Sequence, residues 1–410
     1  MSKNIVLAGL QYDNNLGDQA IYMCAYKMLE RLLIEHGICD ITIRGVDLSG
    51  RVGKNKNRLQ SPFKLAKKVC RKLGCTAGLK RLPYVEARSI SRYLAKRSID
   101  SETAAVIFAG GGIVKYKYQQ FHIYIDEFTK RAERLHVPVL MNAVGVEGYD
   151  AENPDCMLLK NALNRDCVKY ISTRDDIETL AGKYCENHQV TAQVADPVCS
   201  LSFIRPVREK PQAGRVIGLG VVRSGLFVDN DVDFPKEKML AFWTELVREI
   251  ESRGMQCRIF SNGTIDDTIF QNDLARYMGL SEEEKKTLMY ERPTSVKQLV
   301  RYITGFDAVI TGRLHASIIA YSYAVPSVGL VWNDKQRMFG RITGHPERFI
   351  EPEDFNAKAV IEAVMQAMKT GYDEESRVAY CSTTKAFMDR FVREYLAYPD
   401  LDDEEGDVWH

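Results

Sequence analysis

Short runs of apolar, often β-branched residues alternate with longer stretches of helical periodicity along the whole chain. Runs of this kind indicate strands buried on both faces, as in parallel sheets that are covered by helices. The first half contains six of them, at residues 5–10, 41–46, 104–111, 138–146, 168–174 and 191–197. The stretch 18–37 has helical periodicity and ends at Gly37, a residue type that commonly terminates helices. We therefore expect an α/β fold.

A second series repeats this plan without repeating its sequence. Its predicted strands are residues 215–222, 256–263, 308–313 and 326–332, and its first helix covers 236–252. Two prolines and clustered charge without periodicity indicate an interdomain linker at 202–214. We expect two doubly wound, Rossmann-like domains that face a cleft between the carboxyl ends of their strands.

These domains are expected to cover residues 1–205 and 206–370. Two helices are predicted near the end of the chain, over 357–369 and 384–397. The second of them, within residues 371–400, is a candidate to pack across both domains. The acidic stretch 401–410 is predicted to be a disordered tail.

Composition narrows the class of protein. The chain has 410 residues, 45% of them hydrophobic, which is enough to form the cores of two or three domains. Ten cysteines occur without a CxxC pair or a zinc-ligand spacing, and the first residues do not have the pattern of a signal peptide. We therefore expect a cytoplasmic protein with reduced thiols, no metal and no cofactor. No run of about 18 apolar residues predicts a membrane-spanning helix.

Charge is unevenly distributed, although the net charge is only +1. Residues 51–100 contain fifteen Lys or Arg against Glu86 and Asp100, a local net charge of +13. Residues 61–74 can form a helix with one apolar and one basic side, which is typical of helices at membrane surfaces. This pattern fits peripheral contact with the inner face of a membrane and a lipid-linked acceptor. The alternative is a solvated helical face inserted into the first domain. No nucleic-acid partner is expected, because aromatic residues do not accompany the charge.

The loop after the first predicted strand contains the first candidate chemistry. Asn15 and Gly17 supply a turn and a point of backbone approach, and Asp18 supplies a carboxylate at the start of a helix. Loops at the carboxyl ends of strands line the cleft in this type of fold. The alternative interpretation is a well-capped turn in which Asp18 only satisfies backbone amides.

Two further strand ends carry candidate residues. Gly110, Gly111 and Gly112 would let a ligand approach the main chain, although they match neither a P-loop nor a dinucleotide fingerprint. Arg174 ends the strand at 168–174 and would point toward the cleft. A salt bridge from Arg174 to Asp175 or Asp176 is an equally good explanation of that arginine.

The most informative segment begins at the predicted strand 308–313. Arg313 and His315 flank Leu314 at the start of a helix of small residues, where free amides and the helix dipole favour an anion. A buried core histidine is the alternative for His315. Asn333 and Lys335 follow the next strand and would reach the rim of the same cleft.

Taken in order, these segments resemble the polysaccharide pyruvyl transferase family. The resemblance rests on NNLGDQAI (14–21), FAGGG (108–112), STRDD (172–176), ADP (195–197), TGRLHASIIA (311–320) and VPSVGLVWNDK (325–335). It implies a two-domain fold like that of the GT-B glycosyltransferases. It also implies phosphoenolpyruvate as donor, a saccharide hydroxyl pair as acceptor and a pyruvate ketal as product.

Carried over onto this sequence, the resemblance makes Arg313 and His315 the donor-binding and catalytic pair, with Leu314 providing main-chain contact. A second arginine, Arg174 or Arg223, would complete the charge around the donor, because arginine binds carboxylate and phosphate in a bidentate manner. His315 would act as general acid and as a cationic clamp, and Asp18 would accept a hydroxyl proton.

Two alternative functions remain open on the sequence. A nucleotide-sugar-dependent glycosyltransferase would have the same architecture, since fold does not determine chemistry. A non-catalytic saccharide-binding protein could also retain this fold.

Overall fold

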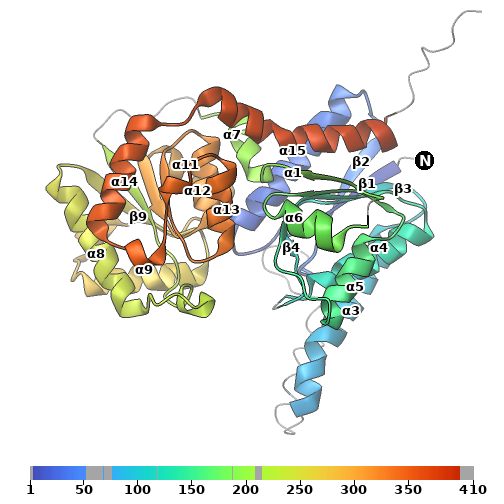
Figure 1. The fold of residues 1–410 in the computed structure, drawn as a ribbon, viewed down its shortest axis with the longest axis horizontal. Coiled ribbons are helices and arrows are strands. Elements are labelled where there is room, and N and C mark those ends of the chain that lie inside the picture. The colour runs from blue at the N-terminus through green and yellow to red at the C-terminus, as the bar shows by residue number, and fades with distance from the viewer. Residues whose placement is uncertain are drawn as a thin grey trace, which may run out of the picture.

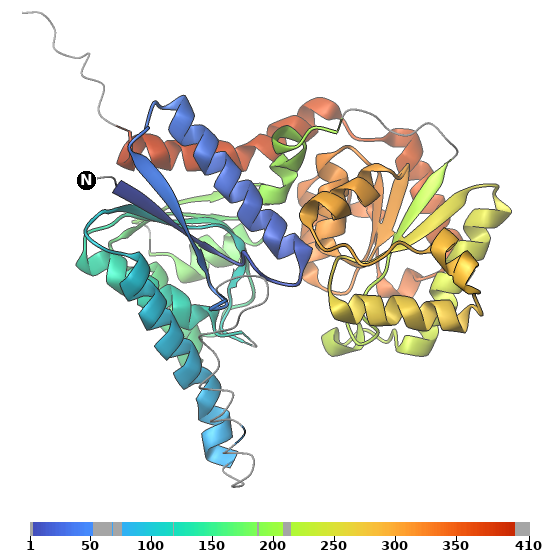
Figure 2. The ribbon, with the colours of Figure 1, turned by 180° about the vertical axis from the view of Figure 1, so that it is seen from behind.

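The computed structural model describes residues 3–51, 68, 76–117, 119–186, 188–207 and 215–397. The predicted amphipathic helix at 61–74 and the predicted acidic tail at 401–410 therefore lie outside the described residues. Two parallel sheets, each flanked by helices, stand side by side (Figures 1 and 2). The predicted α/β class with two doubly wound units is confirmed.

The first sheet has seven strands in the order β2-β1-β3-β5-β6-β7, with β4 paired to β5. All of its pairings are parallel, as Lys3↔Ile41 and Tyr170↔Val190 illustrate. Its strands are β1 (Lys3–Gly9), β2 (Ile41–Asp47), β3 (Thr103–Phe108), β4 (Gly111–Val114), β5 (Val139–Val146), β6 (Val168–Thr173) and β7 (Val190–Gln193). This order reverses between β1 and β3, the kind of position at which such sheets bind ligands.

Side chains alternate between the two faces of this sheet. Val6 and Val106 pack under α3 (Thr76–Ser98), α4 (Phe121–Arg134) and α5 (Pro154–Leu163). Ile5 and Ile107 pack on the opposite face, against α1 (Leu16–Glu35) and α15 (Glu374–Tyr395). Short helical segments, α6 (Ile177–Thr179), Leu180–Tyr184, Pro197–Ser200 and α7 (Leu201–Ile204), complete this half.

The second sheet has five parallel strands in the order β12-β11-β10-β8-β9. They are β8 (Val216–Gly220), β9 (Gln256–Phe260), β10 (Ala308–Thr311), β11 (Ser327–Leu330) and β12 (Phe349–Ile350). One face packs on α8 (Lys236–Ser252), α9 (Ile265–Tyr277) and α14 (Ala357–Thr370). The other face packs on α11 (Val296–Thr304), α12 (Leu314–Ser322) and α13 (Asp334–Ile342). The remaining helices are α10 (Glu282–Leu288), Val228–Asn230, Pro346–Arg348 and Pro352–Asp354.

All four predicted strands of the second half end two or three residues before their apolar runs. In the first half, two predicted strands end three or more residues early. The strand expected at 104–111 ends at Phe108, because Gly110 and Gly111 adopt φ values of 110° and 94°, which break the extended backbone. The strand expected at 191–197 ends at Gln193. Asp196 there caps a helical turn, and its carboxylate accepts a hydrogen bond from the amide of Val198 at 2.8 Å. α7 occupies the first part of the predicted linker, and residues 208–214 are not described.

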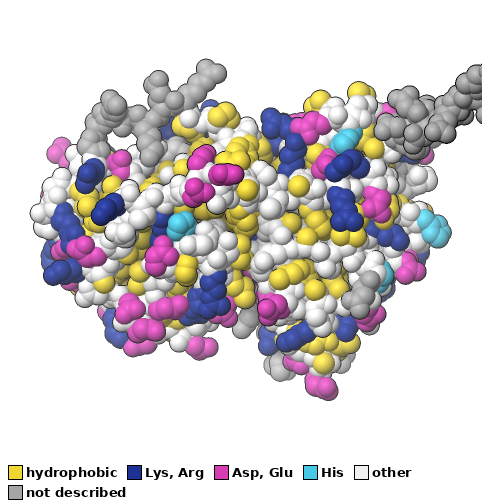
Figure 3. All heavy atoms as spheres, turned by 45° about the horizontal axis from the view of Figure 1, so that its top comes forward, with side chains coloured by type: hydrophobic (Ala, Val, Ile, Leu, Met, Phe, Trp, Pro, Cys, Tyr) yellow, Lys and Arg dark blue, Asp and Glu magenta, His cyan; other side chains and the backbone are white. Residues whose placement is uncertain are grey.

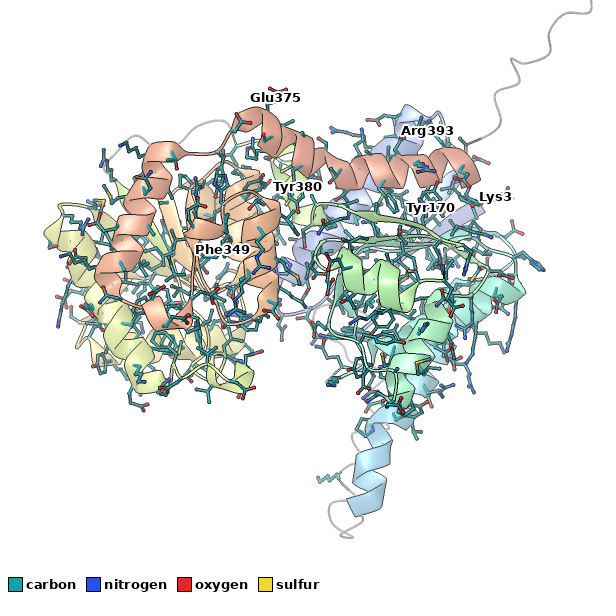
Figure 4. The ribbon with its side chains drawn as sticks, in the orientation of Figure 1. Lys3, Tyr170, Phe349, Glu375, Tyr380 and Arg393 are labelled. Atoms are coloured by element: carbon teal, nitrogen blue, oxygen red, sulfur yellow. The ribbon has the colours of Figure 1, made fainter. Side chains whose placement is uncertain are left out.

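Helix α15 connects the two halves. It begins near the second sheet and runs along the first (Figures 1 and 4), with Tyr170 of β6 beneath it. The Tyr170 hydroxyl donates to Glu394 at 2.5 Å, and Phe387 and Phe391 pack on its ring. Arg377, at the other end of α15, bonds to carbonyls of α12. The helix therefore packs against both halves.

Basic and acidic side chains are interspersed on the face that carries α15 (Figure 3). Among the described residues, no helix combines the length and apolarity needed to cross a membrane.

Candidate active site between the two sheets

Side chains hold the start of α12 in place through hydrogen bonds to the backbone of residues 312 and 313. Thr311, the last residue of β10, accepts a hydrogen bond from the Arg313 amide at 3.0 Å through its hydroxyl. The carbonyl of Gly312 accepts the indole N–H of Trp332 at 2.6 Å and the amide of Gln336 at 3.2 Å. Arg313 is the N-cap residue, so His315 lies in the first turn of the helix. The predicted arrangement of strand end and helix start is present.

His315 meets Arg174 from the other half of the molecule. The two residues are 9% and 8% exposed, and Arg174 Nη1 lies 3.2 Å from His315 Nε2. Arginine can only donate, so this bond requires a lone pair on Nε2 and therefore a neutral imidazole. The same Nη1 is bound by Asp196, at the end of the neighbouring strand. The structure thus pairs Arg174 with Asp196 and His315, and not with Asp175 as the sequence alternative had it.

The protonation of His315 in the ligand-free protein differs from the protonated form that its expected roles as general acid and cationic clamp require. Burial lowers the pKa of His315 to about 4 against the opposing charge of Asp196, and the charges of Arg174, Lys335 and Arg313 lower it further. The side chain is therefore neutral near pH 7 in the ligand-free protein. Any cationic role needs a bound anion to raise this pKa.

Asp18 faces the same site from the first turn of α1. Asn15 caps this turn by accepting the Gly17 amide at 3.1 Å, and its own amide group donates to Asp18 at 2.9 Å. Burial and the nearby Asp13 raise the pKa of Asp18 to about 6, while Arg174 opposes the shift. Asp18 is thus a carboxyl group that titrates close to neutrality.

Gly17 is required by the close approach of the two halves. A Cβ built at Gly17 would lie 2.4 Å from the ring of His315, which is far inside contact distance. Asn262 of the second half also donates to Asn15 at 3.2 Å. The first turn of α1 is therefore part of the interface that places His315.

A lysine pair flanks the other side of the site. Lys335, at the start of α13, binds Glu147 at the end of β5, and Lys115 lies 3.6 Å from the same carboxylate. Burial and Lys335 lower the pKa of Lys115, although Glu147 opposes this. Gly112 lies beside the pair, since a Cβ there would come within 3.1 Å of Lys335 Nζ. Gly110 and Gly111 instead turn the chain between β3 and β4.

The two remaining arginines lie around Asp267. Arg313 binds this buried carboxylate in a bidentate manner, at 3.0 Å from Nε and 2.5 Å from Nη2. Arg223 reaches Asp267 only through its backbone amide, and its guanidinium pairs with Asp229 at 2.5 Å. Of the two arginines proposed as second ligand of a donor, the structure therefore brings Arg174, and not Arg223, to His315.

Leu314 and Asn333 are less central than the sequence suggested. Leu314 packs against the apolar core. Asn333 precedes α13 without capping it, and its buried Oδ1 has no hydrogen-bond partner among the described residues.

Glu147 and Asp267 were not identified from the sequence. Glu147 directly follows a predicted strand, and that position was the available signal. No sequence signal marked Asp267, because the surrounding segment shows no pattern that would link it to Arg313. No group of three His, Cys, Asp or Glu side chains in the described part of the chain could hold a metal ion.

The assembled side chains suit a small, multiply charged anion. Arg174, Lys115 and Lys335 converge on His315 and Asp18 from five strand ends or helix starts, at the carboxyl ends of both sheets. Guanidinium and ammonium groups bind carboxylates and phosphates, and the two titratable groups beside them can transfer protons.

Solved structures share this architecture at low sequence identity. The UDP-GlcNAc 2-epimerase of Methanocaldococcus jannaschii superposes with a TM-score of 0.57 at 13% identity, over 96% of this chain and 100% of that chain. The UDP-GlcNAc 2-epimerase of Neisseria meningitidis gives 0.57 at 12%, over 95% and 100%. The trehalose 6-phosphate synthase of Burkholderia multivorans gives 0.52 at 11%, over 96% of each chain. The fold is the GT-B fold, as expected.

The family model for polysaccharide pyruvyl transferase matches residues 15–334. The chain therefore belongs to the polysaccharide pyruvyl transferase family, and the predicted resemblance is confirmed. A search of the curated proteins found no match.

Replacement of Gly17 by alanine should separate α1 from α12. Because the added Cβ would contact His315 at 2.4 Å, we expect a loss of stability of about 1–3 kcal/mol, measured as a lower midpoint of thermal unfolding. Gly182→Ala is the matched control, since a Cβ there has nothing within 4 Å. Equal unfolding midpoints for the two variants would contradict the close packing of Gly17 on His315.

Proposed function

We propose that the protein transfers the pyruvyl group of phosphoenolpyruvate to two hydroxyls of a saccharide, forming a pyruvate ketal in polysaccharide biosynthesis. The observation that supports this most directly is the buried Arg174 and His315 pair, with Asp18 and two lysines around it, in a chain of this family. A donor with one carboxylate and one phosphate matches a site with several convergent cations.

Positively charged side chains of the site bind the donor. The Nη1 atom of Arg174 already bonds to Asp196 and His315. Its buried Nε has no hydrogen-bond partner among the described residues. Lys335 shares Glu147 with Lys115, so an arriving phosphate can take one ammonium group while Glu147 keeps the other. Arg313 retains Nη1, because Asp267 occupies Nε and Nη2.

Proton transfer follows from the shifted pKa values. The anionic donor raises the pKa of His315 from about 4, so the imidazole takes up a proton when the donor binds. His315 then protonates the methylene carbon of the donor, and the first sugar hydroxyl attacks the neighbouring carbon while its proton passes to Asp18. The bond between that carbon and the phosphate oxygen then breaks, and inorganic phosphate leaves. The second hydroxyl attacks the same carbon and closes the ketal, and its proton passes to His315, which the first step left neutral.

The chief alternative is a nucleotide-sugar-dependent glycosyltransferase. The fold allows it, and one neighbour was solved with UDP-GlcNAc. A small cluster of cations favours a small dianion or trianion over a nucleotide sugar. Thermal stabilisation by phosphoenolpyruvate, and none by UDP-sugars, would separate the two. A saccharide-binding protein without activity would release no phosphate from phosphoenolpyruvate with any acceptor.

His315→Gln, Asp18→Asn and Arg174→Lys test the site. Each should lower acceptor-dependent phosphate release from phosphoenolpyruvate by roughly 100-fold or more, since each removes a proton-transfer group or a bidentate donor. Phosphate release is measured with a panel of oligosaccharide acceptors. His188→Gln, an exposed histidine, is the control and should retain activity. Near-normal rates for His315→Gln would refute the assignment.

Donor binding should take up a proton. At pH 7.5 the free protein holds His315 neutral, so titration with phosphoenolpyruvate in buffers of different ionisation enthalpy should show net uptake. His315→Gln should lower that uptake. Asp18→Asn measures how much of the proton uptake comes from Asp18, the other group of the site whose pKa is shifted. Identical proton counts for the wild type and His315→Gln would show that the donor does not change the protonation of His315.

We also propose a cytoplasmic location with peripheral membrane contact. None of the eight described cysteines forms a disulfide, which suits a reducing compartment. Arg92, Lys96, Lys130, Arg131 and Arg134 line a groove of about 540 Å³ between α3 and α4, with Glu127 as its one acid. Tyr84 and Tyr93 of α3 are 37% and 46% exposed, and this helix projects away from the body (Figures 1 and 2). These two tyrosines correct the expectation that aromatic residues do not accompany the charge of this segment. Exposed aromatics among basic residues are typical of membrane surfaces.

Vesicle sedimentation tests this contact. The full chain should sediment with phosphatidylglycerol vesicles at low salt and not with phosphatidylcholine vesicles. Lys96→Glu/Arg134→Glu should weaken binding about tenfold or more, because each basic residue near an anionic surface contributes about 1 kcal/mol. Arg248→Glu/Lys358→Glu, exposed on α8 and α14, is the charge-matched control. A wild-type chain that stays in the supernatant would rule the contact out.

A further inference from the structure

A second groove lies along the first turns of α1, outside the cluster of ionisable groups. Its volume is about 600 Å³, and three tyrosines line it together with two glutamines: Tyr12, Tyr22, Tyr26, Gln11 and Gln19. Arg205 and the start of α11, including Ser295 and Lys297, form the opposite wall. Both halves of the molecule therefore contribute to it.

The three tyrosines lie in the same groove. Tyr22 and Tyr26 are one helical turn apart on α1, so their rings lie on the same side of the helix. Burial raises the pKa of the Tyr22 hydroxyl, and the nearby Tyr12 and Tyr26 raise it further. Tyr22 is 6% exposed and forms the floor, whereas Tyr12 and Tyr26 are only partly buried and keep ring surface available.

Two neutral polar side chains, Gln11 and Tyr22, line the groove beside β2. Gly45 of β2 makes room for them: a Cβ there would come within 2.3 Å of the Tyr22 hydroxyl and 3.3 Å of Gln11 Oε1. An amide and a phenol placed side by side can donate hydrogen bonds to a ligand in the groove and accept hydrogen bonds from it.

This lining matches the chemistry of a saccharide. Aromatic rings pack against the C–H faces of pyranose rings, and amide and phenol groups exchange hydrogen bonds with sugar hydroxyls. Lys27, Arg205 and Lys297 at the rim are exposed cations that suit acidic substituents on such a chain. The groove contains no carboxylate among its lining residues, unlike the cleft around Arg174.

The groove and the cleft are joined by one loop. Gln11 and Tyr12 precede Asn15, and Gln19 follows Asp18, so neighbouring residues line the two spaces. The Gln19 amide donates to the carbonyl of Asp13 at 2.5 Å, and Asp13 in turn raises the pKa of Asp18. A chain that reaches Asp18 with its terminal sugar can therefore continue along α1.

We propose that this groove binds the glycan chain of the acceptor behind the sugar that receives the pyruvyl group. The proposal rests on the proposed function for the identity of that sugar, but its binding chemistry does not depend on turnover. Tyr26 and Gln11 are the residues that distinguish a chain from a monosaccharide.

Two measurements test the groove. In the first, saturation-transfer NMR without phosphoenolpyruvate compares galacto-, gluco- and manno-tetraoses with their monosaccharides. At least one tetraose should bind, and Tyr26→Ala or Gln11→Ala should abolish its signal. Tyr26→Phe should retain part of it, and Tyr277→Ala, on α9 and 55% exposed, should retain all of it.

In the second, phosphate release gives KM for the same acceptors. Tyr26→Ala should raise KM for the tetraose about tenfold, the effect of one lost aromatic contact, while KM for the monosaccharide and for phosphoenolpyruvate stays unchanged. Equal KM changes for both acceptors, or no tetraose binding at all, would overturn the groove. Tetraose binding without any phosphate release would leave the groove supported and overturn the proposed function instead.

Discussion

The site depends on one buried guanidinium. Arg174 lies almost fully inside the protein, where a charge without partners would cost several kcal/mol. Asp196 supplies the compensating charge, and His315 accepts a further hydrogen bond from the other half of the molecule. Because arginine cannot accept, this bond orients the ring of His315 and favours its neutral form, to which burial contributes most. This contact therefore fixes the position of His315 where the two halves meet.

The two halves can hold this contact because their interface has two parts. One apolar core runs from α1 through α11 and α12 to α15 and belongs to both sheets. Polar contacts close the interface at the cleft, where Asn262 meets Asn15 and Lys335 meets Glu147. The proposed anionic donor would compete with Glu147 for the lysine and would leave the apolar core intact. Ligand binding can therefore rearrange the cleft without separating the halves.

Much of the fold could be predicted, because buried parallel strands appear as apolar runs and their ends place residues at one edge of each sheet. Arg313, His315 and Arg174 were located on this basis. Their partners could not be found in this way: Arg174 and His315 are 141 residues apart, and Arg313 and Asp267 are 46 apart. Such pairs form only when whole units pack together, and nothing local specifies that packing. The predicted end of the strand at 104–111 was wrong because Gly110 and Gly111 turn the backbone.

Burial shifts the pKa values of the two titratable groups of the site in opposite directions, and the physical reason is the same for both. A low-dielectric environment disfavours charge, so it raises the pKa of Asp18 to about 6 and lowers that of His315 to about 4. Both groups are thereby moved toward their neutral forms, while Arg174 keeps its charge because Asp196 is beside it. The resting cleft therefore has fixed positive charge and two groups whose protonation a bound anion can change. GT-B neighbours share the frame at 11–13% identity. A shared frame at such low identity leaves the chemistry to be determined by side chains at the strand ends.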